Sequence, residues 1–352
     1  MCKQDDIDTF IPDLMEWFQK NARDLPWRKT TDPYCIWISE IMLQQTRVEA
    51  VKGYYRRFLE ALPTILDLAQ AEEDLLLKLW QGLGYYNRVR NMQTAAKTIV
   101  ETYDGIFPNT YKEIRSLKGI GDYTAGAVAS IAFGLPNAAV DGNVLRVMSR
   151  LFADAQDIAA AKTKVYWKEI LEEMMPKDQP GQFNQALMEL GACICLPNGD
   201  PLCHKCPVRP YCMAYQKNAI DFYPVKSQKN ARKVQQLSVF FLVNDRNEIA
   251  LHKRGEKGLL AGLWELPNIP ADISAPAAFS QWGIHQADIS ILPLHKHIFT
   301  HIEWHMEPYF VRVKEFGETP FIWVTPLQAE KKYALPSAFQ KIWNDGISQL
   351  NN

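Results

Sequence analysis

Two glycines that flank one hydrophobic residue, Gly119-Ile120-Gly121, constrain the fold of this chain more than any other feature of its sequence. A helical pattern ends at Leu117-Lys118, and a run of small residues typical of a closely packed helix starts near Tyr123. Glycine permits the positive φ of a sharp turn and the close approach of another backbone. Free N–H groups at the start of the second helix can hold a phosphate. The pattern predicts a helix-hairpin-helix, which clamps a DNA backbone without reading its sequence, although a Gly-x-Gly pair alone is usually an ordinary turn.

Two carboxylates stand out beside this motif. Asp141 follows the hairpin and precedes another amphipathic run, so by itself it is an ordinary helix N-cap. Glu40 lies in a strongly apolar helical pattern that Asp32-Pro33 should start, and by itself it is an exposed charge. Brought into one pocket, the two could cleave a glycosidic bond, one as the acid and the other stabilising an oxocarbenium-like sugar. The residues alone leave both interpretations open.

The bulk properties argue against a membrane protein and leave nucleic-acid binding to local patches. The chain has 352 residues, 47% of them hydrophobic and 22% charged, which indicates two globular domains. No apolar run reaches the roughly 18 residues that a membrane span needs. The formal net charge is −1, so any DNA contact depends on local basic groups. The acidic amino terminus, Met1 to Asp6, matches neither a signal nor a transit peptide.

The pattern of the chain changes after a cysteine-rich loop at residues 193–212. Helical periodicity before and around this loop predicts an all-α domain over residues 1–217. Residues 218–234 are basic and lack periodicity, which is typical of a linker. Strand-like runs such as Leu237–Val243 and a final helical stretch predict an α+β domain over residues 235–345. The expected fold class is therefore multidomain, all-α followed by α+β.

The cysteine-rich loop offers four thiolates, Cys195, Cys203, Cys206 and Cys212. Five of the seven cysteines lie in this stretch, and in a chain without a targeting signal such clustering favours a metal site over disulfides. A four-cysteine zinc site usually shows two close pairs, and only Cys203 and Cys206 form one here. A [4Fe–4S] cluster accepts uneven spacing. Zinc stays an alternative, and the fifth thiol, Cys193, is a possible substitute ligand.

Seven motifs in order carry a resemblance to the MutY-type adenine DNA glycosylases, within the endonuclease III-like helix-hairpin-helix group. The similarity covers almost the whole chain, including the carboxy-terminal domain. The motifs are Leu25-Pro26-Trp27-Arg28, Ser39 to Val48, Gly82-Leu83-Gly84-Tyr85-Tyr86, Leu117 to Gly121, Tyr123-Thr124-Ala125, Val140 to Val144 and Phe183-Asn184-Gln185-Ala186.

The resemblance implies base excision repair: hydrolysis of the N-glycosidic bond of adenine mispaired with 8-oxoguanine or guanine in double-stranded DNA. Glu40 would protonate the adenine, which requires a raised pKa. Asp141 would stay ionised and stabilise the sugar, positioned with it by Tyr123 and Asn143. Related lyases carry a Schiff-base lysine at the position of Tyr123, and strand cleavage through an imine requires an amine. The family pattern therefore implies a monofunctional glycosylase.

The target base must leave the helical stack before it can react. By resemblance, Gln45 and Tyr85 fill the gap, Thr46 and Leu83 touch the opposite base, and Trp27, Arg28 and Gln185 form the adenine pocket. The remaining residues implied to contact substrate or DNA are Leu43, Gly119, Gly121, Phe299, Thr300 and His301.

The second domain resembles a NUDIX fold, because Leu260 to Pro267 looks like the start of that motif. The acidic helix that would hold Mg²⁺ does not follow, so no Mg²⁺ is expected there. His297 to His301 matches the loop that the family uses to recognise 8-oxoguanine, with Thr300 where a serine is usual. The alternative is a plain strand edge with a buried histidine.

Three other functions stay open: a bifunctional endonuclease III-like glycosylase/lyase, a nucleotide pyrophosphatase run by the second domain, and a non-catalytic lesion-binding protein. The chain departs from the family pattern at two places. Seven residues separate Cys195 from Cys203, where six is usual. Asp122 puts a negative charge beside the glycine turn, which should weaken phosphate binding slightly. We expect a monomer with one [4Fe–4S] cluster, located in the cytoplasm with the nucleoid.

Overall fold

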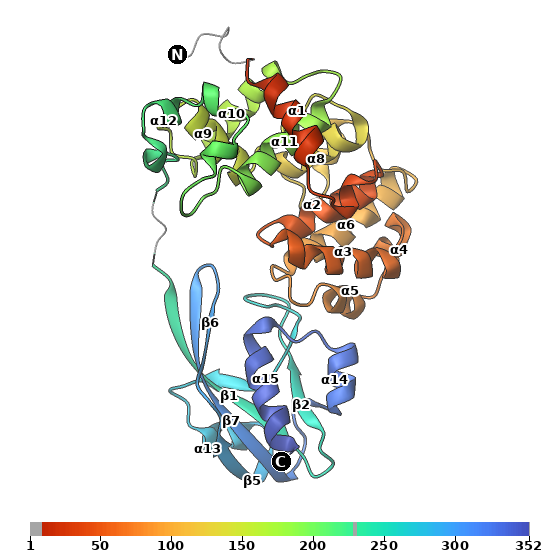
Figure 1. The fold of residues 1–352 in the computed structure, drawn as a ribbon. Helices are drawn as coiled ribbons and strands as arrows, with labels where there is room; N and C mark the ends of the chain where they lie inside the picture. The colour runs from red at the N-terminus through yellow and green to blue at the C-terminus, as the bar shows by residue number, and fades with distance from the viewer. Residues whose placement is uncertain (1–8, 228–230, 352) are drawn as a thin grey trace. The chain divides into compact units, whose positions relative to one another are not determined.

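The computed structural model describes residues 9–227 and 231–351. They form two compact units, one built from residues 9–70 and 91–227 and the other from residues 71–90 and 231–351 (Figure 1). The amino terminus, on which the expectation of an untargeted chain rests, lies outside the described residues. In the described part, no helix is long and apolar enough to cross a bilayer.

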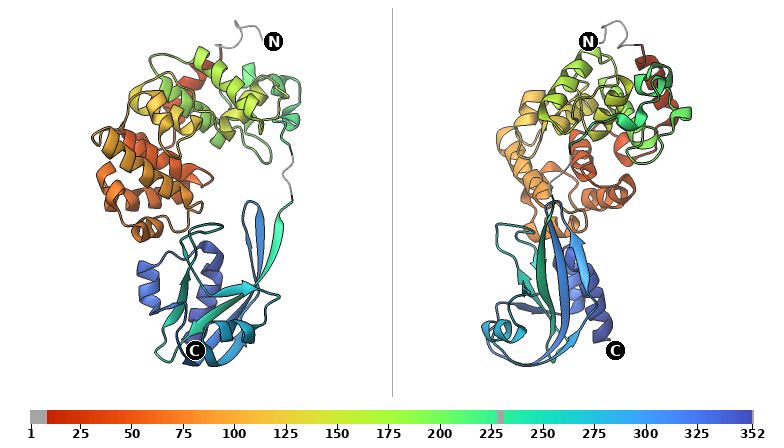
Figure 2. Two further views of the ribbon diagram at one scale, coloured as in Figure 1. Left: turned by 180° about the vertical axis from the view of Figure 1, so that it is seen from behind. Right: turned by 90° about the vertical axis from the view of Figure 1, so that its left-hand side faces the viewer.

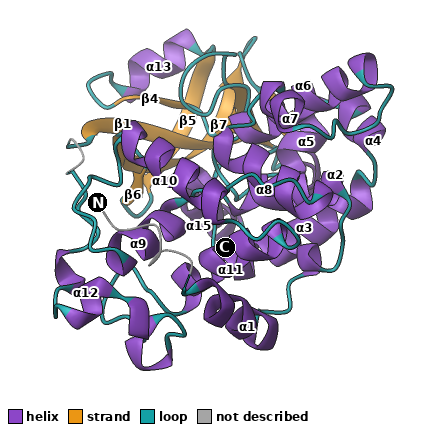
Figure 3. Cartoon of the chain, turned by 90° about the horizontal axis from the view of Figure 1, so that it is seen from above, coloured by secondary structure: helices purple, strands orange, loops and turns teal. Residues whose placement is uncertain are grey.

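The described residues of the first unit form helices and no strand, as expected of an all-α domain. The strands, orange in Figure 3, belong to the second unit. Its helices are α1 (Ile11–Asn21), α2 (Pro33–Leu43), α3 (Val48–Ala61), α4 (Ile65–Gln70), α6 (Asn87–Thr102, which starts in the second unit), α7 (Tyr111–Ser116), α8 (Asp122–Phe133), α9 (Gly142–Leu151), α10 (Ala161–Met174), α11 (Pro180–Cys193) and α12 (Met213–Gln216).

The glycine turn between α7 and α8 has the geometry that the sequence predicts. Gly119 takes a φ of 80°, in the left-handed region that favours glycine, and a Cβ there would lie 2.6 Å from Asn91 Cβ. Gly121 is instead the N-cap of α8 with a φ of −91°. Arg115 Nε donates to Asp122 Oδ1 over 2.7 Å, so the negative charge at the start of α8 already has a counter-ion.

Local capping explains where α2 begins but not where α3 begins. Asp32 accepts a hydrogen bond from Tyr34 N over 2.8 Å at the start of α2, as predicted. The sequence from Thr46 to Glu49 has the pattern of a capping box, but no capping box forms there. Arg47 is the N-cap of α3, without a side-chain hydrogen bond, and Thr46 Oγ1 turns back to Gln44 O at 3.4 Å.

The second unit is built on a mixed sheet with strand order β3-β2-β1-β7-β5. The long strands β1 and β7 run parallel in its centre, and the other pairs are antiparallel; β4 pairs with β1, β6 with β7 and β8 with β2. The strands are β1 (Lys233–Val243), β2 (Ile249–Lys253), β3 (Trp264–Glu265), β4 (Asn268–Pro270), β5 (Ile284–Ile291), β6 (His295–Ile298), β7 (Ile302–Phe316) and β8 (Ile322–Val324).

The second half of strand β1, from Ser238 to Val243, is buried on both faces, and its alternate side chains pack into two separate cores. Phe241 packs in one core with Phe339 and Trp343 of α15 (Ser337–Leu350). Phe240 packs in the other core with Phe279 of α13 (Ala275–Gln281). Figure 2 shows these two helices on opposite faces of the sheet. The period of two residues along a strand produces this division.

Residues 71–90 belong to the second unit although they precede most of the first in sequence. Helix α5 (Glu73–Leu79) lies in this segment and faces α14 (Pro326–Lys332). Lys78 Nζ donates to Tyr333 O over 3.1 Å, and Gln81 Nε2 donates to Leu335 O over 2.9 Å. The predicted boundary at residues 218–234 therefore does not describe this early segment.

Candidate active site

A pocket of about 180 Å³ in the first unit is lined by most of the residues predicted for chemistry and base binding. It lies among the turn at Pro26–Arg28 and helices α2, α8, α9 and α11. The predicted residues that line it are Trp27, Arg28, Glu40, Leu43, Thr46, Tyr123, Asp141, Asn143 and Gln185. Glu40 and Asp141, whose proximity could not be inferred from the sequence alone, thus face the same pocket.

Glu40 is buried in α2 with only 5% of its surface exposed. Tyr123 donates its hydroxyl to Glu40 Oε2 over 2.6 Å. Burial, together with the nearby charge of Asp141, raises the pKa of Glu40 from 4.5 to about 7. The Tyr123 hydrogen bond and the charge of Arg28 act in the opposite direction. The result is a carboxyl group that can hold a proton near neutral pH.

Asp141 is both the N-cap of α9 and a wall of the pocket, so the two interpretations of this residue are compatible. Its Oδ1 accepts from the backbone N–H groups of Asn143 and Val144, each over 2.8 Å, and its Oδ2 accepts from Asn143 Nδ2 over 2.7 Å. Burial raises the pKa of Asp141, and these hydrogen bonds oppose the increase. They also fix the carboxylate at a helix start, where negative charge is favoured.

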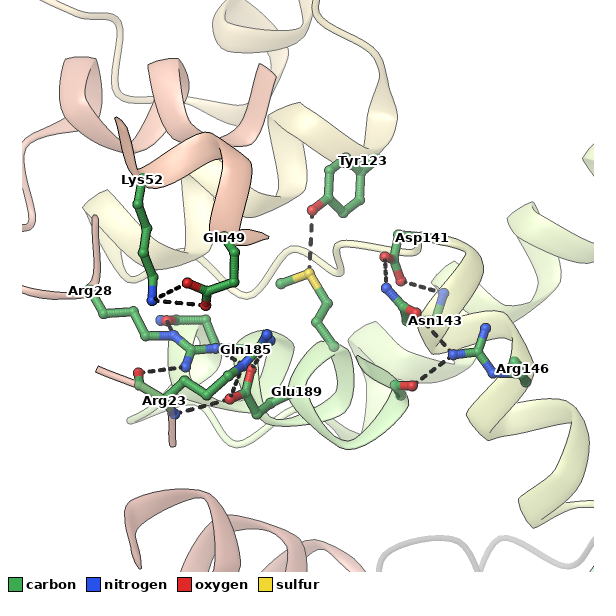
Figure 4. Close-up of polar contacts among 12 residues, drawn as sticks. Arg23, Arg28, Glu49, Lys52, Tyr123, Asp141, Asn143, Arg146, Gln185 and Glu189 are labelled. Atoms are coloured by element: carbon green, nitrogen blue, oxygen red, sulfur yellow. Dashed lines mark hydrogen bonds and ion pairs between the residues drawn. The ribbon is translucent and has the colours of Figure 1, made fainter. Parts of the chain in front are cut away.

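Close helix packing holds Asn143 in place. A Cβ on Gly191 of α11 would lie 2.6 Å from Asn143 Cβ, so only glycine permits this approach. Arg146 Nη2 donates to Asn143 Oδ1 over 2.9 Å and to Gly191 O over 2.7 Å. Figure 4 shows Asp141, Asn143 and Arg146 as one chain of contacts. The amide of Asn143 is therefore oriented with its NH₂ group toward Asp141.

Tyr123 stands between the two carboxyl groups. Burial, followed by the charges of Glu40 and Asp141, raises the pKa of its phenol well above the ordinary value. Its hydroxyl also lies 3.3 Å from Met188 Sδ. The phenol therefore stays protonated and serves as a hydrogen-bond donor, and it offers no amine for imine chemistry.

Comparisons with known proteins place this arrangement in a family. A model of the HhH-GPD superfamily of base excision DNA repair proteins matches residues 38–177, and a model of the NUDIX domain matches residues 238–345. The adenine DNA glycosylase of Rattus norvegicus is 32% identical over 90% of this chain and 72% of its own length. That of Buchnera aphidicola subsp. Acyrthosiphon pisum (strain APS) is 33% identical over 94% of this chain and 95% of its own length. The chain belongs to the adenine DNA glycosylase family.

Other relatives match only in part. The chain spans about half the length of the Arabidopsis thaliana adenine DNA glycosylase, 48%, with 39% identity. Among solved structures, a thermostable thymine-DNA glycosylase matches 60% of this chain with a TM-score of 0.56 and 31% identity. A trapped endonuclease III–DNA covalent intermediate matches 62% with a TM-score of 0.54 and 25% identity. The resemblance stated from the motifs, and the fold class, are thereby confirmed.

The four predicted cluster ligands line a second, small cavity with mostly apolar walls. Arg150 Nη1 donates to Cys195 Sγ over 3.3 Å. Burial raises the pKa of Cys206 to about 12 in the absence of a cation, and a bound iron cluster would reverse that effect. No group of three His, Cys, Asp or Glu side chains within residues 9–227 and 231–351 is already arranged around a common metal position. The shared cavity and the thiol donors fit the cluster, and Cys193 is not among its lining residues.

The residues predicted to read 8-oxoguanine lie in the second unit. Strand β6 ends at Ile298, and Phe299, Thr300 and His301 form the connection to β7. Phe299 packs against Trp304 with ring centroids 4.8 Å apart. The Thr300 hydroxyl lies 2.5 Å from the Tyr85 hydroxyl.

Gln45 and Tyr85, the residues implied to fill the gap in the DNA, share a rare backbone conformation. Their φ angles are 58° and 49°, a region that residues other than glycine seldom adopt. Both side chains are exposed. Leu83, in contrast, is buried with 6% of its surface exposed. Strained turns of this kind cluster at functional sites.

Sequence reasoning missed several residues of the pocket wall, above all Arg23 and Glu189. Both carboxylate oxygens of Glu189 accept from Arg23, Nε over 2.8 Å and Nη2 over 2.7 Å. The sequence does contain a signal for Glu189: it is an acidic residue within an apolar stretch of α11, four positions after Gln185 and so on the same face of the helix. Figure 4 shows this cluster apart from the Asp141 chain.

Proposed function

We propose that this chain is a monofunctional DNA glycosylase that hydrolyses the N-glycosidic bond of adenine opposite 8-oxoguanine or guanine in duplex DNA. The observation that carries the proposal is the shared pocket of Glu40, Tyr123 and Asp141, with a pKa of about 7 for Glu40. The names of the relatives support the substrate. One carboxyl group holds a proton and the other is fixed as a hydrogen-bonded acceptor, which is the division of roles that glycosidic cleavage needs.

The proposed reaction starts with an everted adenine in the pocket. Glu40 transfers its proton to the adenine ring and converts the base into a neutral leaving group. Asp141 stabilises the positive charge that develops on the sugar, and its fixed hydrogen bonds require no reorganisation at that step. Water then completes hydrolysis and leaves an abasic site. Tyr123 orients Glu40, and Asn143 orients Asp141.

The four thiols of the second cavity would hold a [4Fe–4S] cluster, which would brace the loop that carries Lys205 and Arg209. The second unit would read 8-oxoguanine through Phe299, Thr300 and His301. It would do so without Mg²⁺, because α13 carries no acidic residue. A monomer located with the nucleoid is part of the same proposal. Broad visible absorbance of the purified protein would support iron, whereas a colourless, zinc-containing protein would contradict it.

One assay separates the proposal from its alternatives. The purified chain is incubated with a duplex that holds adenine opposite 8-oxoguanine, and products are analysed with and without alkali. Free adenine with strand breaks only after alkali is expected. Strand breaks without alkali would indicate a lyase. Tight binding without adenine release would indicate a lesion-binding protein.

A further inference from the structure

A buried carboxylate with two cations lies in the wall of the same pocket, and the reaction scheme above does not use it. Glu189 of α11 has only 1% of its surface exposed. Besides the two bonds from the Arg23 guanidinium, it accepts from the Arg23 backbone N–H over 3.0 Å and from Arg28 Nη2 over 2.9 Å. Burial opposes the ionised form, but the hydrogen bonds from Arg23 and Arg28 outweigh it and lower the pKa of Glu189 to about 2. Glu189 is therefore a fixed negative charge at any working pH.

The cluster holds Arg28 in one orientation. Arg28 Nη1 donates to Arg23 O over 3.1 Å, and its Nε donates to Gln185 Oε1 over 3.2 Å. The guanidinium also lies over the Phe18 ring, 5.2 Å from its centroid. Each of the three guanidinium nitrogens of Arg28 thus has a partner other than Glu40.

Arg28 is close enough to Glu40 to influence its proton affinity, since its charge lowers the pKa of that acid. The charged and titratable groups around Glu40 are Tyr123 on α8, Asp141 before α9 and Arg28 on the Pro26–Arg28 turn. Glu189, with Arg23, lies on the same pocket wall as Arg28. The set of Arg23, Arg28 and Glu189 carries one excess positive charge. Without Glu189 it would carry two.

We propose that Glu189 is a positioning residue of this enzyme: it holds the guanidinium groups of Arg23 and Arg28 on the pocket wall, so that neither forms an ion pair with the acid Glu40. An Arg28 released from Glu189 would be free to pair with Glu40, which lines the same pocket and whose pKa the charge of Arg28 already lowers. A cation beside a carboxyl group favours its ionised form. Glu40 would then lose, at neutral pH, the proton that it must deliver. This inference rests on the proposed role of Glu40.

The test is the pH dependence of adenine release in single turnover by the full chain, compared among charge variants. Glu189→Gln keeps the size of the side chain and removes its charge. The alkaline limb of the rate profile is the decline of the rate at high pH. In Glu189→Gln we expect this limb to shift to lower pH by about one pH unit. Release should be roughly tenfold slower at pH values above the limb and little changed at pH values below it. Glu189→Asp keeps the charge and should leave the limb in place.

Two further variants keep the proposal testable even where Glu189→Gln does not fold. Arg23→Gln removes one cation and should move the alkaline limb up. The double variant Arg23→Gln/Glu189→Gln restores the original net charge but still leaves Arg28 without Glu189, so its limb should stay below the wild-type position. A rate that falls equally at every pH in Glu189→Gln, or a limb that does not rise in Arg23→Gln, would overturn the proposal.

Glu40→Gln, measured in parallel, separates the two levels of inference. Full activity of Glu40→Gln would remove Glu40 as the acid and with it the proposed mechanism. An inactive Glu40→Gln together with charge variants that leave the limb unmoved would remove only the role of Glu189.

Discussion

The two units each bury one glutamate to the same degree but surround it differently. Glu40 in the first unit and Glu265 in the second both have 5% of their surface exposed. Glu40 has a neutral phenol as its hydrogen-bond donor. Glu265 instead accepts hydrogen bonds from the guanidinium of Arg254 and, over 2.8 Å, from Asn268 Nδ2. Its carboxylate also lies 3.1 Å from His252 Nδ1. Burial alone does not make an acid catalyst. A cation bonded to a carboxyl group favours its ionised form.

The same contrast exists within the first unit. Glu189 and Glu40 line one pocket, and their pKa values lie at about 2 and about 7. Two guanidinium groups are hydrogen-bonded to Glu189 and none to Glu40, which accounts for the difference between the two pKa values. A pair of carboxyl groups whose environments separate their pKa values is a hallmark of acid catalysis, and here a third, Asp141, supplies the anion.

The largest effect is expected from Glu40→Gln, which removes the transferable proton and keeps the shape. Adenine release from a duplex with adenine opposite 8-oxoguanine should slow by about 10²- to 10⁴-fold. Duplex affinity should stay within a few-fold, because the side chain is buried away from the DNA backbone. Single-turnover release and a binding titration measure the two quantities. Release at the wild-type rate would contradict the assignment.

Glu265→Gln tests the other side of the comparison. It should leave the rate of adenine release unchanged, because its glutamate bonds only within the second unit. It should destabilise that unit by about 1–3 kcal/mol, because the buried Arg254 contact loses its counter-charge. Chemical denaturation followed by tryptophan fluorescence gives the stability. A loss of turnover without a loss of stability would show that the two glutamates do not differ as described.

Glu40 should also reduce the stability of the native state at alkaline pH. Its pKa rises from 4.5 to about 7 on folding, so its stabilising contribution is complete below pH 4.5 and is lost as the pH rises through about 7. At about pH 8, Glu40→Gln should therefore stabilise the chain by ~1–3 kcal/mol, and at about pH 4 the variant should gain nothing. Thermal unfolding at both pH values measures this. An equal gain at both would point to packing instead of ionisation.

Local sequence signals anticipated much of the first unit. Asp32 at the start of α2 and the Gly119 turn act through neighbouring atoms, which the sequence displays directly. The capping box at Thr46 failed because the chain turns back at Gln45, whose positive φ no local propensity predicts. The pairing of β1 with β7 also escaped prediction, since parallel strands need not be neighbours in sequence.

The site shows the same limit. The motifs identified Glu40, Tyr123 and Asp141 one by one, but only the packing of α2, α8 and α9 brings them to one pocket. Glu189 was hidden because a charged residue on a helix is ordinarily solvated. Its burial depends on Arg23, 166 positions away in the chain. Partners that distant leave no periodic trace in the sequence.

The smallest effect is expected from Tyr123→Phe, which refines the contrast between a neutral and a cationic donor. The Tyr123 hydrogen bond lowers the pKa of Glu40, so its removal should raise that pKa further. The alkaline limb of the rate profile should move up by about half a unit, with a few-fold slower maximum because Glu40 loses its orienting partner. Met188→Leu, which removes only the sulfur contact of the same hydroxyl, is the matched control and should leave the limb in place. A downward shift in Tyr123→Phe would mean that the phenol helps Glu40 to keep its proton, and the neutral donor would then be an active part of the acid.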